Sequence, residues 1–155
     1  MNAPAPFRKP RILPPMWLAL TALAMVALDR WLPLAQPVGE HGPLLFIIFL
    51  IPALVILAWS VAAFLRVRTG LVPFSESTAL VTTGLYRFSR NPMYLAMVLL
   101  LIAGAFRLGS VGAWLPIPVF AWIIHHRFIL NEERFLESVH GEDFRVYCGR
   151  VRRWL

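Results

Sequence analysis

Charged residues are scarce in this chain, and their scarcity excludes a soluble domain. Of its 155 residues only 15% are charged and 59% are hydrophobic, and the mean hydropathy is +0.67. Soluble domains average about 25% charged residues, and a folded chain of this size leaves about a third of its surface exposed to solvent. So much apolar surface cannot be hidden from water. The composition therefore predicts an integral membrane protein with a single domain.

Cysteine is almost absent, and the sequence patterns of several soluble folds are missing. Cys148 is the one cysteine, so no internal disulfide can form. The sequence has no strand-like alternation and no internal repeat. No glycine-rich loop follows a strand and opens a helix, which excludes a Rossmann nucleotide site and a P-loop. The sequence predicts an all-α, non-Rossmann bundle of membrane helices.

Four apolar runs, at residues 17–35, 43–65, 92–108 and 111–130, are predicted to form transmembrane helices. A helix needs about 20 residues to cross a bilayer core, with about 17 to 25 usual. The last two runs are short and nearly contiguous, so they are predicted to form a helical hairpin. Around these spans, residues 1–15 are expected to be an N-terminal tail and 16–155 one membrane domain. Residues 131–155 are expected to be its cytoplasmic tail, with two helices that meet near Gly141.

The net charge of +7 follows the predicted topology. The N-terminal tail and residues 65–91 each carry a net charge of +3, residues 125–155 carry +1, and the opposite helix ends are neutral. Basic residues concentrate in cytoplasmic loops of membrane proteins. We therefore expect a multi-pass protein of a bacterial inner membrane, with both termini in the cytoplasm. The basic residues would contact anionic lipid headgroups, and no nucleic-acid partner is expected.

The loop before the third run contains the first group of candidate site residues. In a structural interpretation, Asn91 caps the helix, Pro92 takes its first position, and Arg90 extends towards the lipid headgroups. In a functional interpretation, the free N–H groups and positive dipole of this helix N-terminus bind a carboxylate or a phosphate. The residues alone leave both interpretations open.

The end of the fourth run contains the second group. On a helix His126 shares a face with Glu133, while His125 and Glu132 lie on a neighbouring stripe. These residues are either the solvated end of a helix or a functional site, because ionisable groups at membrane depth are costly. No metal site is expected, because adjacent helical residues diverge by about 100° and the two histidines cannot easily share one ion.

Two motifs in this order resemble the isoprenylcysteine carboxyl methyltransferase family, a broad group that is similar to the phospholipid N-methyltransferases. The motifs are LVTTGLYRFSRNPMYL at 80–95 and EERFLESVHGEDFRVYCGRVRRW at 132–154, and the resemblance extends from residue 69 to the C-terminus. It implies an all-helical membrane core that binds S-adenosylmethionine at the cytoplasmic end of the last two spans, under the C-terminal tail. Asn91 departs from the family pattern because its best-known members have histidine there, and Asn91 supplies no titratable group.

The predicted site combines the resemblance with the helical face that carries His126. The predicted cofactor-binding residues are Gly84, Tyr86, Arg90, Asn91, Pro92, Tyr94, His126 and Glu132. The predicted catalytic residues are Arg127, Glu132 and Glu133. We expect the first motif to hold the cofactor carboxylate and an acid of the pair to bind its ammonium or ribose hydroxyls.

The predicted reaction is methyl transfer from S-adenosylmethionine to a lipophilic acceptor at the cytoplasmic face of the membrane. An isoprenylcysteine-like carboxylate needs no base, and Arg127 would orient it. A lipid headgroup amine needs a base, for which Glu133 and His126 are the candidates. Two alternatives remain open: an NADPH-dependent membrane reductase of the sterol reductase type, and a non-catalytic membrane scaffold subunit.

Overall fold

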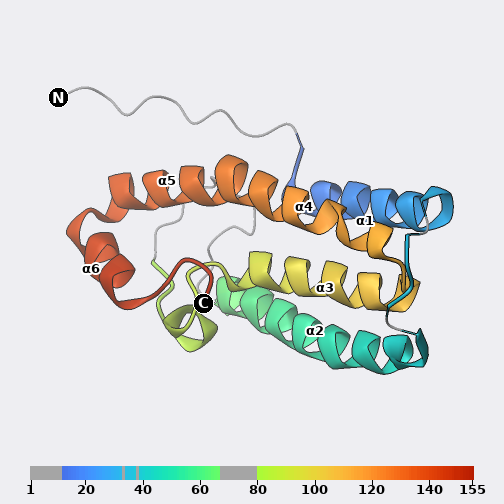
Figure 1. The fold of residues 1–155 in the computed structure, drawn as a ribbon. Coiled ribbons are helices and arrows are strands. Elements are labelled where there is room, and N and C mark those ends of the chain that lie inside the picture. The colour runs from blue at the N-terminus through green and yellow to red at the C-terminus, as the bar shows by residue number, and fades with distance from the viewer. Residues whose placement is uncertain (1–11, 33, 38, 67–79) are drawn as a thin grey trace.

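The computed structural model describes residues 12–155 except 33, 38 and 67–79, and it describes only the backbone at positions 64 and 66. Every regular element in this part of the chain is a helix (Figure 1), which confirms the predicted all-α fold for the described residues. Most of the basic N-terminal tail and much of the basic loop at 65–91 lie outside them, so those expectations stay predictions.

Each of the four predicted apolar runs contains a helix, although the first helix ends at Trp31 and the run was predicted to extend to 35. The first three are α1 (Pro14–Trp31), α2 (Gly42–Arg66) and α3 (Pro92–Leu108). The fourth run begins with a 3-10 turn, η3 (Val111–Trp114), and continues through α4 (Pro116–Ile124), the π-helical η4 (His125–Ile129) and α5 (Leu130–His140). The remaining elements are the short 3-10 helices η1 (Gly39–His41) and η2 (Gly84–Arg87) and the helix α6 (Glu142–Arg150).

Prolines and glycines set the helix ends. Pro14, Pro92 and Pro116 each stand in the first turn of a helix, where a missing N–H costs nothing. Gly109 ends α3 with a φ of 93°, in the left-handed region that glycine adopts readily. The helix of the fourth run extends beyond the predicted end of the apolar span at 130 to His140, because no helix-breaking residue occurs before Gly141, where the sequence predicts its end. At Gly141 the chain turns into α6, as predicted.

Two helices of the described residues are long and apolar enough to cross a membrane, at Gly39–Ala63 and Val111–His140. The helix α3 is apolar but shorter, and α1 is not among the candidate spans. The count of four spans therefore stays a prediction. The helix α2 leaves many large apolar side chains exposed, which suits contact with lipid. They include Leu44, Ile47, Ile48, Ile51, Leu54, Val55 and Trp59.

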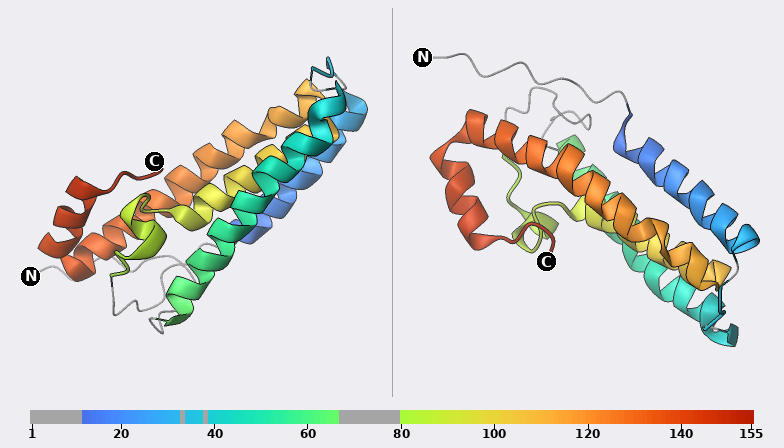
Figure 2. Two further views of the ribbon diagram at one scale, coloured as in Figure 1. Left: turned by 90° about the horizontal axis from the view of Figure 1, so that it is seen from below. Right: turned by 45° about the horizontal axis from the view of Figure 1, so that its top comes forward.

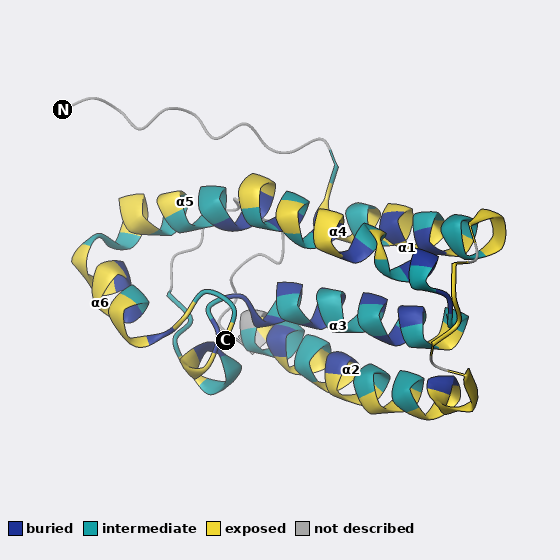
Figure 3. Ribbon diagram, viewed as in Figure 1, coloured by how far each residue is buried: buried dark blue, intermediate teal, exposed yellow. Residues whose placement is uncertain are grey.

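The apolar core lies between α1, α3 and the long fourth helix, as the buried faces in Figure 3 show. Met25 of α1 packs with Leu101 of α3 and Phe120 of α4, and each is at most 3% exposed. The helix α2 packs mainly along α3, on the side away from α4 (Figure 2). At Gly112 the chain passes so close to α1 that an added Cβ would lie 2.6 Å from the carbonyl oxygen of Leu32.

The helices alternate in direction, so the start of α1, the end of α2, the start of α3 and the start of α5 lie at one end of the bundle (Figure 1). The helix α5 extends beyond that end, and α6 folds back beside it (Figure 2). The last residues then run to the start of α3, where the Arg90 N–H donates to the carbonyl oxygen of Arg152 at 3.0 Å. This end of the bundle therefore joins the two sequence motifs.

Candidate functional site

The start of α3 is held by the loop before it and by the C-terminal segment after α6. The Asn91 N–H donates to Ser89 Oγ at 3.1 Å, and Asn91 Nδ2 donates to the carbonyl oxygen of Arg153 at 2.9 Å. Asn91 occupies the N-cap position, but its side chain does not cap the helix. The side-chain cap of the structural interpretation is not formed: Asn91 Nδ2 donates to the carbonyl oxygen of Arg153, and the side-chain oxygen, which is the capping group, makes no hydrogen bond to a helix N–H.

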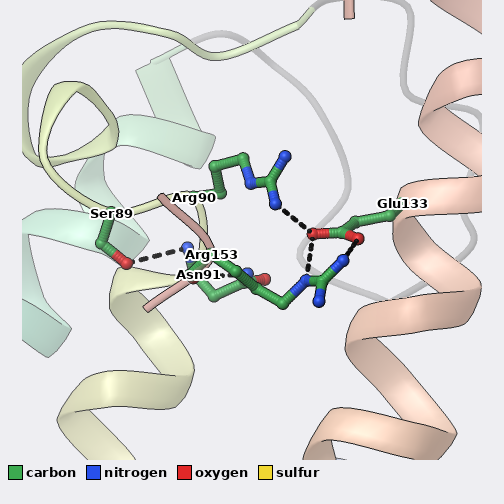
Figure 4. Close-up of polar contacts among 5 residues, drawn as sticks. All are labelled: Ser89, Arg90, Asn91, Glu133 and Arg153. Carbon is green, nitrogen blue, oxygen red and sulfur yellow. Dashed lines mark hydrogen bonds and ion pairs between the residues drawn. The ribbon is translucent and has the colours of Figure 1, made fainter. Parts of the chain in front are cut away.

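Glu133 of α5 lies between two arginines (Figure 4). Arg90 Nη2 is 3.1 Å from Glu133 Oε1, and Arg153 donates from Nε to Oε1 at 2.9 Å and from Nη2 to Oε2 at 2.7 Å. Only 12% of the Arg90 side chain and 16% of the Glu133 side chain are exposed, so solvent screens this pair weakly. Two guanidinium groups around one carboxylate leave the cluster with a net charge of +1.

Arg90 also has an unused donor. Its Nε is buried and has no hydrogen-bond partner. A buried polar atom without a partner is costly, so an unpaired donor of this kind marks a place where a ligand could bind. The donor lies at the N-terminus of α3, where backbone N–H groups and the helix dipole also favour an anion.

Glu132 contacts a tyrosine, whereas the adjacent Glu133 contacts two arginines. The Tyr94 hydroxyl donates to Glu132 Oε2 at 3.2 Å, and among the described residues no ion pair involves Glu132. The carboxylate is half-buried, and its charge also acts on Tyr86. The pKa of the Tyr86 phenol is raised above its usual range, first by burial and then by Glu132. Tyr86 therefore stays neutral at neutral pH, near a carboxylate that makes no ion pair with the described residues.

The C-terminal segment covers this end of the bundle. The Tyr147 hydroxyl in α6 donates to the carbonyl oxygen of Tyr86 at 2.7 Å, and both residues are buried. Burial raises the pKa of Tyr147 to about 12, so this hydroxyl remains a donor at neutral pH. Phe144, Tyr147 and Val151 form a small apolar cluster against Leu80, and Trp154 packs on the main core. The helix α6 and the residues after it thus lie over the start of α3.

Gly84 and Pro92 serve the backbone of the loop. Gly84 has a φ of 64°, and a Cβ there would lie 3.3 Å from Trp59 Nε1, so a larger residue would strain the turn and crowd α2. Pro92 is buried at the first position of α3. Their contribution to the predicted site is the shape of the loop that carries Tyr86 and Arg90.

His126 and Arg127 have other partners than the paired acids, and in the described part of the chain neither forms an ion pair with Glu132 or Glu133. His126 is exposed, and its Nδ1 lies 2.9 Å from the carbonyl oxygen of Trp122 on the same helix. Because a carbonyl can only accept, Nδ1 carries the hydrogen in a neutral ring and Nε2 is the basic nitrogen. The Arg127 guanidinium lies over the Trp17 ring, 6.0 Å from its centroid. Both residues belong to η4, and π-helical turns are frequent at functional sites.

Arg153 was missed by the sequence reasoning, although its side chain makes the shortest contact with Glu133. It stands in the basic run RVRRW beside Arg150 and Arg152, which are both exposed. Nothing in the spacing distinguishes Arg153 from these neighbours, because its inward direction depends on the return of the chain after α6. No cluster of three or more metal-ligating side chains occurs in the part of the chain that the structure describes.

A comparison with known protein families identifies the family of this chain. Residues 43–143, which are more than half of the chain, match the family model for phospholipid methyltransferases. The chain belongs to the phospholipid methyltransferase family. This membership confirms the family that the two motifs indicated.

A curated relative of this phospholipid methyltransferase family member is an uncharacterized protein of Haemophilus influenzae. The two sequences are 43% identical over 63 residues, which cover 41% of this chain and all of the relative. No solved structure matches the chain. The family membership, together with two helices apolar enough to cross a bilayer, indicates a membrane methyltransferase.

Proposed function

We propose that this member of the phospholipid methyltransferase family transfers a methyl group from S-adenosylmethionine to a lipophilic acceptor. The observation that carries the proposal is the convergence of the two motifs on one polar cluster. Arg90 and Tyr94 of the first motif contact Glu133 and Glu132 of the second, respectively. The resulting cluster has both a positive and a negative side under the C-terminal tail.

The charges of this cluster fit the amino-acid end of the cofactor, which carries a carboxylate and an ammonium. Arg90 has a buried donor without a partner, and it lies beside the N-terminus of α3, so it would bind the carboxylate. Glu132 has no cationic partner among the described residues and would bind the ammonium. Glu133 is already engaged by two arginines on both of its oxygens, so Glu132 is the better partner of the two acids.

The tail would exclude water from the reacting groups. When bound, S-adenosylmethionine supplies an electrophilic methyl group on a positively charged sulfur. Transfer from such a group depends mainly on alignment and on a dry environment. The buried contacts of Tyr147 and Val151 hold α6 and the C-terminal segment over the start of α3, which supports both requirements.

The proposal includes two acceptor chemistries, each with its own residue. A carboxylate acceptor needs no base, and Arg127 would orient it from the exposed surface of η4. An amine acceptor needs a base, for which His126 is better suited than Glu133. His126 has a basic Nε2, whereas both oxygens of Glu133 accept hydrogen bonds from arginine.

We also propose that the site faces the cytoplasm and that α1 and α3 cross the bilayer together with α2 and the long fourth helix. The starts of α1, α3 and α5 lie at the same end of the bundle, which agrees with this topology. The exposed Arg87 and Arg134 add positive charge at that end, as cytoplasmic segments do.

Calorimetry on the purified protein in detergent tests the proposed function. S-adenosylhomocysteine is expected to bind and to raise the unfolding temperature by mass action, whereas NADPH is expected to do neither. A second assay follows label from methyl-labelled S-adenosylmethionine into lipids extracted from membranes that contain the protein. Absence of S-adenosylhomocysteine binding, or binding of NADPH in its place, would overturn the proposal.

A further inference from the structure

The side chain of Arg153, in the C-terminal segment, reaches the paired acids of the candidate site although Arg153 lies outside the part of the chain that matches the family model. The match ends at residue 143, whereas Arg153 makes two hydrogen bonds to Glu133. The carbonyl oxygen of the same residue accepts from Asn91 at 2.9 Å. Arg153 thus contacts residues of both motifs at once.

Glu133 serves as a bridge between two positive charges. Its Oε1 accepts from Arg153 Nε at 2.9 Å and lies 3.1 Å from Arg90 Nη2, and its Oε2 is 2.7 Å from Arg153 Nη2. A carboxylate can bind one guanidinium through two parallel hydrogen bonds, and Arg153 takes this arrangement. Arg90 is therefore left with a single contact to Glu133, and its buried Nε remains free of hydrogen bonds.

From this arrangement we infer that Arg153 is a positioning residue that keeps Arg90 available for the carboxylate of the cofactor. Without Arg153, Glu133 is free to turn and take Arg90 in the bidentate mode, which would occupy Nε. With Arg153 present, Arg90 Nε has no hydrogen-bond partner and the cluster of two arginines and Glu133 keeps its net positive charge. The inference rests on the proposed function, because the carboxylate in question belongs to S-adenosylmethionine.

The test compares a ligand that has the amino-acid end, with the carboxylate that Arg90 would bind, and a ligand that lacks this end. S-adenosylhomocysteine carries the carboxylate, and 5′-methylthioadenosine has the same nucleoside without the amino-acid end. Arg153→Gln is expected to weaken S-adenosylhomocysteine binding about tenfold, which is the scale of one charge-assisted hydrogen bond. Binding of 5′-methylthioadenosine is expected to change by less than about twofold.

Two matched variants separate charge from bulk effects at this position. Arg152→Gln changes an exposed neighbour whose backbone carbonyl, not its side chain, makes the contact, so both affinities are expected to stay at the parent value. Arg153→Lys keeps the charge but loses the planar fork, so part of the affinity for S-adenosylhomocysteine is expected to return. In a Glu133→Gln protein, Arg153→Gln is expected to have little further effect, because the bridge is already lost.

The single cysteine gives a readout of the tail without any ligand. Cys148 is half-buried in α6 beside Arg90, and burial raises the pKa of its thiol while Arg90 opposes the shift. If Arg153 only held the tail in place, Arg153→Gln would release α6 and speed the reaction of this thiol with a maleimide. The inference predicts no faster reaction, because Tyr147 and the apolar cluster around Val151 still hold the tail, and the loss of a nearby positive charge can only disfavour the reactive thiolate.

Selective loss of S-adenosylhomocysteine binding without a faster thiol reaction supports the positioning role. Equal losses for both ligands, a faster thiol reaction, or parent affinity in the Arg153→Gln protein would each overturn it while the proposed function stands. Failure of the parent protein to bind S-adenosylhomocysteine would instead overturn the proposed function, and this inference with it.

Discussion

Replacing Glu132 with glutamine removes one negative charge from the site and keeps almost the same shape. The Tyr94 hydroxyl donates to Glu132 Oε2 at 3.2 Å, and a glutamine oxygen can accept the same hydrogen bond. Among the described residues Glu132 makes no ion pair, so the change breaks none of their ion pairs. The Glu132→Gln protein is therefore expected to fold and to unfold at nearly the parent temperature.

The loss of charge is expected to appear in ligand binding. A hydrogen bond to a charged group contributes about 1.5–3 kcal/mol, against about 0.5–1.5 kcal/mol for a neutral one. The difference of roughly 1–1.5 kcal/mol corresponds to about a tenfold weaker affinity for S-adenosylhomocysteine, whose ammonium Glu132 would bind. Tyr94→Phe keeps the charge and removes only the hydroxyl, so it is expected to weaken binding by a smaller factor.

Isothermal titration of the purified proteins with S-adenosylhomocysteine in one detergent measures this difference. Glu137→Gln is the matched control, because Glu137 is exposed on the same helix and makes no ion pair within the described part of the chain. The control is expected to bind as the parent does. Equal affinities for the parent and the Glu132→Gln protein would refute the assignment of this carboxylate to the ammonium.

Three further predictions concern stability and topology. Gly112→Ala is expected to lower the free energy of unfolding by about 1–3 kcal/mol, because the new Cβ would lie 2.6 Å from a carbonyl oxygen. Gly149→Ala has open space around it and is expected to stabilise α6 slightly. Thermal unfolding in detergent compares the two variants, and equal shifts in unfolding temperature would contradict the packing argument. Burial raises the pKa of Tyr147 to about 12 from 10.0, so the contribution of this phenol to the free energy of unfolding is complete below pH 10 and is lost as the pH rises towards 12. Between pH 9 and 11.5 the parent should therefore lose more stability than the Tyr147→Phe protein. Parallel losses in the two proteins would show that this phenol does not contribute. In a cysteine-free background, Glu137→Cys should react with an impermeant maleimide only in inverted vesicles, and Gln36→Cys only in right-side-out vesicles. The two positions lie at opposite ends of the bundle, because Gln36 follows α1 and Glu137 lies in α5. Labelling of both positions from one side of the membrane would contradict the topology.

The helices were largely predictable from the sequence because local patterns determine them. The third apolar run was predicted at residues 92–108, and α3 has these bounds because Pro92 starts it and Gly109 ends it. The fourth apolar run was predicted to end at 130 and its helix near Gly141, and α5 ends at His140. The two ends differ because polar residues after 130 end the apolar character without breaking the helix.

The polar contacts of the site were less predictable, because they depend on how distant segments meet. The sequence brought Arg90, Tyr94 and the paired acids into one site by resemblance, and the structure shows contacts among them. Arg153 was missed because its direction depends on the turn of the chain after α6. Its carbonyl oxygen also accepts from Asn91 Nδ2, a long-range contact that fixes the Asn91 side chain in an arrangement without the helix cap that its residue type indicated.

The most direct test of the central claim is an experimental structure of this protein with S-adenosylhomocysteine bound. The account predicts that the amino-acid end of the ligand lies between the start of α3 and the start of α5, with its carboxylate at Arg90 and its ammonium at Glu132. A ligand bound at the opposite end of the bundle, or one that leaves both of these residues without contact, would contradict it.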